Sequence, residues 1–335
     1  MNLSQALLNQ NRLALTRLLT QVENNTEQGR AALDELFPHT GKAHLIGITG
    51  APGTGKSTLV NQLALHYRKE HNFRVAILAV DPSSPFTGGA VLGDRVRMRD
   101  LTGDQDIFIR SMASRGSLGG LAQSTSAMVQ LFDAANYHVI LVETVGAGQA
   151  EVDIAKLAHT TLVVEAPGLG DDIQAIKAGI LEIADILVIN KADRPGVENT
   201  ERALKGMLEL AHPTRHVFQH HGRRMVVEAP TKEDEQYDIW IPEIKRTIAK
   251  NGEGISELGE AIARHVAFLR ETDEWSRQTR TQLQSTFDSL LRENLFNRFM
   301  DELSPQQYEE TLSQIIKREE SPWCAVERLL EESKK

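Results

Sequence analysis

The sequence predicts an α/β fold in which a doubly wound, mostly parallel sheet carries helical extensions at both ends of the chain. Short, near-continuous apolar segments alternate with longer helical stretches from about residue 44 onward, a pattern typical of strands that crossover helices bury on both faces. A glycine-rich loop joins the first of these segments to the first helix after it. Ligands of such sheets bind beyond the carboxyl ends of the strands, so we expect the site there.

The elements are predicted from apolar runs that end in Gly, Pro or Asp. The expected strands are His44–Gly50, Phe73–Asp81, Tyr137–Gly146, Thr160–Pro167 and Asp185–Asp193. The expected helices between them include Lys56–His71, Leu121–Ala134 and Asp172–Ile183.

Near the N-terminus, apolar side chains recur at helical spacing, which predicts an amphipathic helix packed on the main domain. They are Leu8, Leu15, Leu18, Leu19 and Val22. Residues 1–22 also hold two arginines and no acid, so an organellar transit peptide is the alternative.

We expect three segments: a helical one at residues 1–40, the main domain at 41–270 and a helical dimerisation segment at 271–335. The last carries 9 basic and 14 acidic residues. It also has an apolar stripe that needs burial against the same chain or a second copy. The stripe comprises Trp275, Leu283, Phe287, Leu290, Leu291, Leu295 and Phe299.

Composition excludes several classes of protein. With 37 Lys and Arg against 46 Asp and Glu, the net charge of −9 argues against nucleic acid as a partner. The single cysteine, Cys324, forms no internal disulfide and indicates a reducing compartment, so we expect a cytoplasmic protein. No apolar run reaches the ~18–20 residues of a membrane span.

The glycine-rich loop matches the phosphate-loop pattern GxxxxGK[ST] and has the strand before it and helix after it that this pattern requires. It predicts a P-loop NTPase. The expected nucleotide-binding residues here are Gly50, Ala51, Pro52, Gly53, Thr54, Gly55, Lys56, Ser57 and Thr58. Backbone N–H groups and the helix N-terminus favour an anion. Lys56 is expected to reach the β- and γ-phosphates, and Ser57 to bind Mg²⁺.

The identity of the bound nucleotide base is predicted from an NKxD pattern at the end of the fifth apolar strand, formed by Asn190, Lys191 and Asp193. A carboxylate there accepts hydrogen bonds from guanine N1–H and from its N2 amine, a donor pair that adenine lacks. The sequence therefore favours GTP and GDP, with ATP as the alternative.

Further acids are candidates for the metal and for catalysis. Glu143 closes the third strand and is followed by Gly146, where NTPases of this class place an acid near Mg²⁺ and an N–H that senses the γ-phosphate. Asp81 and Asp94 are candidate ligands of Mg²⁺ or water, or else members of turns. Ala147 follows Gly146, so a water-positioning Gln is missing and we expect slow hydrolysis that a partner accelerates.

Together these motifs resemble the MeaB/ArgK family, the G proteins that act as chaperones of adenosylcobalamin-dependent acyl-CoA mutases such as methylmalonyl-CoA mutase. The resemblance covers residues 10–200 closely. Besides the motifs above it rests on Val80–Pro85, Leu92–Arg95 and Gly170–Lys177.

The resemblance implies a GTPase that gates cofactor delivery to the mutase and protects it. It implies that Asp81, Asp94 and Glu143 are acids near the metal, and that Lys177, in a third switch segment, contributes transition-state charge. It also implies a homodimer formed by the C-terminal helices.

The sequence departs from the family pattern at Ile248, where a Ser usually supports guanine O6, so that contact is left to the backbone of Ala249. Residues 211–238 match poorly and are expected to be an exposed excursion. Their histidines, His212, His216, His220 and His221, leave a nickel-insertion GTPase as the second hypothesis. A kinase linked to amino-acid transport is the third.

Overall fold

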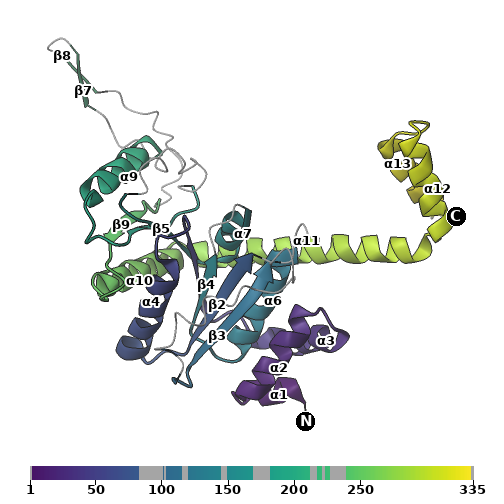
Figure 1. The fold of residues 1–335 in the computed structure, drawn as a ribbon, viewed down its shortest axis with the longest axis horizontal. Coiled ribbons are helices and arrows are strands. Elements are labelled where there is room, and N and C mark those ends of the chain that lie inside the picture. Colours follow the sequence, from purple (N-terminus) through teal and green to yellow (C-terminus); the bar gives the residue numbers. More distant parts are fainter. Residues whose placement is uncertain are drawn as a thin grey trace. The chain divides into compact units, whose positions relative to one another are not determined.

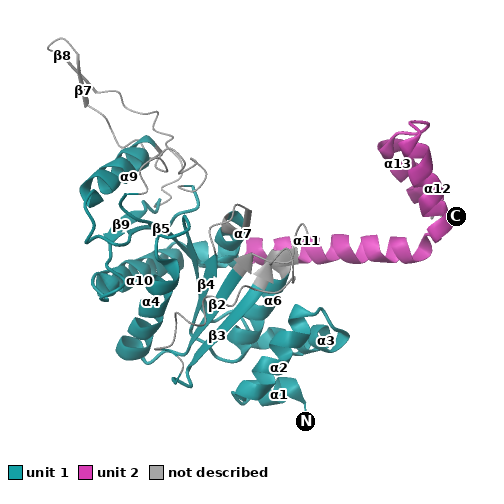
Figure 2. Cartoon of the chain, in the orientation of Figure 1, with its two compact units in different colours: residues 1–279 teal, residues 280–335 magenta. Residues whose placement is uncertain are grey.

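The computed structural model describes residues 2–82, 101, 103–114, 120–144, 149–168, 182–211, 217–220, 223–226 and 239–332. It divides into two compact units, residues 1–279 and 280–335 (Figure 2). Asp94, Gly146 and Lys177 lie outside the described residues. The predicted segment boundaries at residues 40 and 270 stay a prediction.

The larger unit contains a seven-stranded sheet in the order β3-β2-β4-β1-β5-β6-β9, and every strand pairing described in it is parallel. The strands are β1 (His44–Thr49), β2 (Val75–Pro82), β3 (Ile107–Ser114), β4 (Val139–Thr144), β5 (Thr160–Glu165), β6 (Ile186–Ile189) and β9 (Glu243–Arg246). Successive strands are added on both sides of β1. This confirms the predicted α/β class with a doubly wound parallel sheet.

Helices cover both faces of the sheet (Figure 1). The helices of the core are α4 (Lys56–His71), α6 (Gly120–Ala134), α7 (Gln149–Leu157), α9 (Val197–Ala211) and α10 (Ile255–Glu271). Alternate side chains of a strand point to opposite faces, so Ile46 and Ile77 pack with α4 and α10. Leu45 and Leu78 pack with α6 and α7 on the other face.

Three N-terminal helices belong to the larger unit: α1 (Leu3–Leu8), α2 (Arg12–Glu23) and α3 (Glu27–Leu36). Side chains of Asn2, Asn11 and Thr26 cap them by accepting backbone N–H bonds. The apolar face of α2, which includes Leu15 and Leu19, is buried in the core cluster that contains α6. The predicted amphipathic helix packed on the main domain is therefore confirmed.

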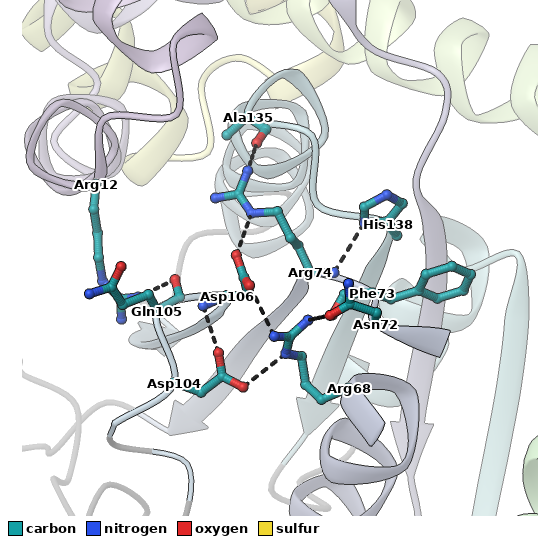
Figure 3. Close-up of polar contacts among 10 residues, drawn as sticks. All are labelled: Arg12, Arg68, Asn72, Phe73, Arg74, Asp104, Gln105, Asp106, Ala135 and His138. Carbon is teal, nitrogen blue, oxygen red and sulfur yellow. Dashed lines mark hydrogen bonds and ion pairs between the residues drawn. The ribbon is translucent and has the colours of Figure 1, made fainter. Parts of the chain in front are cut away.

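A charged network joins α4 to the turn that enters β3 (Figure 3). Arg68 pairs with Asp104 at 2.8 Å and with Asp106 at 2.9 Å, and Arg12 of α2 donates to the carbonyl of Gln105 at 2.8 Å. Burial raises the pKa of Asp104, but the hydrogen bonds from Arg68 and from the Asp106 N–H outweigh it, so the pKa is lowered overall. The network holds one sheet edge against the helices around it.

Two strands of the sheet, β3 and β9, were not among the expected ones. Both lie at sheet edges, and their sequences, IFIRSMAS and EIKR, lack the apolar run of a strand buried on both faces. The predicted excursion at 211–238 contains an antiparallel pair, β7 (Val217–His220) with β8 (Arg223–Val226). The expected helix Asp172–Ile183 falls almost wholly outside the described residues.

The C-terminal helices are α11 (Glu274–Glu302), α12 (Pro305–Ile316) and α13 (Pro322–Glu332). The smaller unit comprises most of α11 with α12 and α13. Stripe residues Phe287 and Leu295 are 64% and 57% exposed, and Leu283, Leu290 and Leu291 are exposed as well. Trp275, at the start of the stripe, instead stacks on His159. Among the helices that the structure describes, none is both long and apolar enough to cross a bilayer.

Candidate nucleotide-binding site

The phosphate loop lies between β1 and α4 and requires glycine at two positions. Gly50 and Gly55 have φ of +136° and +95°, a region that side chains with a Cβ rarely adopt. A Cβ at Gly50 would collide with the carbonyl oxygen of Val164, and one at Gly55 would lie 2.5 Å from Nδ2 of Asn190. The loop is thus pressed against β5 and the segment after β6, which fixes its curve.

Lys56 is 6% exposed and its ammonium group lies inside the curve of the loop. Its Nζ donates to the carbonyl of Gly50 at 2.8 Å and to that of Ala51 at 3.0 Å. Thr54 closes the same turn by donating its hydroxyl to Ala51 at 3.0 Å. The arrangement holds a positive charge at the N-terminus of α4, where an anion is also favoured by the helix dipole.

The structure brings Ser57 and Glu143, two of the four predicted Mg²⁺ ligands, into contact. The hydroxyl of Ser57 donates to Oε1 of Glu143 at 2.6 Å, and Glu143, at the end of β4, is 5% exposed. A buried carboxylate beside a hydroxyl is the oxygen donor set that Mg²⁺ prefers, since this ion takes one or two protein ligands together with phosphates and water. The residues present therefore fit the ion.

Asp81 lies at the same edge of the sheet, although only its backbone is described. It belongs to β2, two residues after Ala79, which is the register partner of Glu143. Within the described residues, no three His, Cys, Asp or Glu side chains group as a metal site.

Asn190 ties the segment after β6 to the phosphate loop. Its Nδ2 donates to the carbonyl of Thr54 at 2.8 Å. Its Oδ1 accepts from the hydroxyl of Thr247 at 3.2 Å and from the N–H of Ala249 at 3.0 Å. Lys191 has a positive φ of 57° and donates to the carbonyl of Gly53.

Asp193, the carboxylate predicted to read the base, is exposed on the turn that follows. The Ala249 N–H, which we expected to serve guanine O6, is directed at Asn190 in this structure. Pro52 and Thr58, also predicted here, lie in the phosphate loop and in the first turn of α4.

Sequence reasoning missed three threonines that support the loops. Thr144 donates its hydroxyl to that of Thr49 at 3.1 Å, which links the ends of β4 and β1, and Thr247 supports Asn190 as described above. All three are buried. A polar residue at the end of an apolar strand is the sequence signal that could have found them.

A parallel sheet with β1 at its centre and a lysine-bearing glycine loop before α4 defines a P-loop NTPase. The family model for methylmalonyl-CoA mutase-associated GTPase MeaB matches residues 15–304. The chain belongs to this family, which confirms the resemblance seen in the sequence, and it is thus a GTPase.

Similarity to individual proteins agrees with this. A GTPase relative from Pyrococcus horikoshii is 41% identical over 320 residues, covering 96% of this chain and 94% of the relative. GTPase ArgK of Escherichia coli is 33% identical over 328 residues, covering 96% and 92%. The mitochondrial methylmalonic aciduria type A homolog of Mus musculus is 32% identical over 254 residues, covering 76% and 56%.

Among solved structures, an LAO/AO transport system kinase superposes with a TM-score of 0.70 at 26% identity, covering 99% of this chain and 97% of that one. The likeness extends over nearly the whole length of both chains.

Proposed function

We propose that this GTPase binds GTP with Mg²⁺, hydrolyses it slowly to GDP, and acts as a chaperone that gates cofactor delivery to an adenosylcobalamin-dependent acyl-CoA mutase and protects that enzyme. The observation that best supports binding of GTP with Mg²⁺ is the contact of Ser57 with Glu143 beside Lys56 at the N-terminus of α4. The name of the family, and that of the mouse relative, support a mutase such as methylmalonyl-CoA mutase as the partner.

Each residue of the phosphate site has a separate task in this proposal. Lys56 exchanges its loop carbonyls for β- and γ-phosphate oxygens, which replaces neutral acceptors by charged ones. Ser57 and Glu143 hold Mg²⁺, with Asp81 and Asp94 nearby as further ligands or positioning groups for water. When bound, the ion neutralises charge that develops on the β- and γ-phosphates.

The base and the switch segments complete the scheme. Asp193 accepts hydrogen bonds from the N1–H and N2 amine of guanine, and this residue is exposed. Gly146 senses the γ-phosphate through its N–H. Lys177 supplies positive charge in the transition state when the mutase is bound.

We further propose that the chain works as a homodimer in the cytoplasm. The exposed apolar stripe of α11 supports this, because a face with side chains as exposed as Phe287 and Leu295 is stabilised when a second copy covers it.

The test is GTP hydrolysis by the full chain alone and with purified methylmalonyl-CoA mutase. We expect the mutase to bind and to accelerate hydrolysis; no change in rate together with no binding would refute the chaperone function. Lys177→Ala should keep GDP affinity and lose the acceleration. Lys205→Ala, an exposed lysine of α9, is the matched control and should keep both.

A further inference from the structure

A cavity lies at the amino ends of the strands, at the opposite edge of the sheet from the phosphate loop. Its volume is about 520 Å³, within the range of small-molecule sites. It is lined by the last turns of α4, by the starts of β1 and β4, by the residues leading into β2, and by α10. Tyr67 is the first residue of α4 in the lining and follows Lys56 by eleven residues, so about 17 Å of helix separates the cavity from the phosphate loop at 1.5 Å per residue.

One wall of the cavity consists of aromatic rings that lie nearly parallel. The rings of Tyr67 and Phe73 are 6.3 Å apart with 16° between their planes, and those of Phe73 and His138 are 5.0 Å apart with 10°. Helix α10 contributes the aliphatic lining of Ile262 and Val266. Flat aromatic and aliphatic surfaces of this kind suit a planar apolar ligand.

The charged groups of the lining favour an anion. Lys42 and Arg270 bring two positive charges, whereas the Asp133 carboxylate is already engaged by the backbone N–H groups of residues 41, 42 and 43. Burial and the neighbouring His159 lower the pKa of His44, so this histidine is neutral. Arg270 is held with its guanidinium 5.3 Å from the centre of the Trp275 ring.

Tyr67 adds a hydroxyl group to the lining. A phenol donates one O–H, so a carboxylate in the cavity would accept from Tyr67 and pair with a cation of the lining.

We propose that this cavity is a second ligand site, separate from the nucleotide site, that binds a small aromatic carboxylate. The aromatic body lies against Tyr67 and Phe73, and the carboxylate meets Arg270 or Lys42. The aromatic carboxylate site does not depend on the mutase, so its test is independent of the test of the proposed function.

The experiment uses 1-naphthoate as the probe and the neutral 1-naphthalenemethanol as its uncharged counterpart. Each is titrated calorimetrically into the full chain saturated with GDP and Mg²⁺. We expect saturable binding of one naphthoate per chain, at least about tenfold tighter than the alcohol because charge-assisted hydrogen bonds are lost with the alcohol.

Variants locate the binding. Ala263→Trp places an indole in the lining and should weaken naphthoate binding at least about tenfold. Ala267→Trp, an exposed position one turn along α10 outside the lining, should change it by less than about twofold. Arg270→Gln should weaken naphthoate and leave the alcohol unchanged. GDP affinity, measured on each variant, reports that it is folded.

Three results would overturn the proposal: no saturable binding of naphthoate, equal affinity for acid and alcohol, or equal losses in the two Trp variants. If Ala263→Trp fails to bind GDP, Arg270→Gln and the comparison of acid with alcohol decide the question.

Discussion

The ring of His159 should make the stability of the larger unit depend on pH. Its Nδ1 accepts the N–H of Leu45 at 3.1 Å, so a proton at Nδ1 would displace that hydrogen bond. The ring also stacks on Trp275 at 3.9 Å. Burial, together with the charge of Arg270, lowers the pKa of His159 to about 4. The folded state therefore keeps this histidine neutral where the unfolded chain protonates it.

The sign and size of the pH effect on the free energy of unfolding follow from the difference in the pKa of His159 between the folded and unfolded states. Above the unfolded pKa of about 6.5 both states are neutral and the group has no effect; as the pH falls below it, only the unfolded state gains the proton, which destabilises the fold. Lowering the pH from about 7.5 to about 5 should thus reduce the free energy of unfolding by about 2 kcal/mol through this residue. The loss would level off below about pH 4.

Urea unfolding of the wild type and of His159→Asn at both pH values measures this. Asparagine keeps an acceptor for the Leu45 N–H and does not titrate, so the variant should lose about 2 kcal/mol less than the wild type on acidification. His159→Phe keeps an aromatic ring against Trp275 and should show the same reduced pH dependence. Equal acid sensitivity of all three proteins would refute the reasoning.

Other perturbations have expected outcomes of their own. Lys56→Met should weaken GDP binding by more than about tenfold with little change in unfolding free energy, measured by calorimetry and urea titration. Asp193→Asn should weaken GDP binding by about 2 kcal/mol, or about thirtyfold, and leave ADP binding unchanged; an equal loss for both nucleotides would contradict base reading by Asp193. Arg68→Ala should destabilise the chain by about 1–2 kcal/mol, since Asp104 and Asp106 lose their shared partner, whereas substitution of the exposed Arg202 of α9 by Ala should not.

The sequence was sufficient to predict the central strands, α4 and the phosphate loop because their signals are local. The apolar run 44–49 and the glycines that follow it encode strand, turn and helix within a few residues. The edge strands β3 and β9 carry no such signal, because a strand with one free edge needs fewer apolar residues.

In the candidate site, too, the features with local sequence signals were predicted and those that depend on distant segments were not. The pattern names Asn190, but the bonds of its side chain to Thr54, Thr247 and Ala249 depend on segments more than 50 positions away, as the separations of 136, 57 and 59 show. The cavity at the amino ends was not predicted either, since its lining is drawn from four separate stretches of the chain. Contacts of that range are set by the tertiary fold.

Asn190 has a consequence for how the nucleotide site behaves as a mechanical unit. One buried amide hydrogen-bonds the phosphate loop and the segment at 247–249, and it belongs to the segment after β6. The two segments predicted to contact the base are therefore linked to the phosphate loop through the same side chain. A movement that released the nucleotide by shifting either of those two segments would also shift the phosphate loop. Nucleotide exchange would then always include a change at the phosphate loop. A partner that moved one of the three segments would move the other two with it.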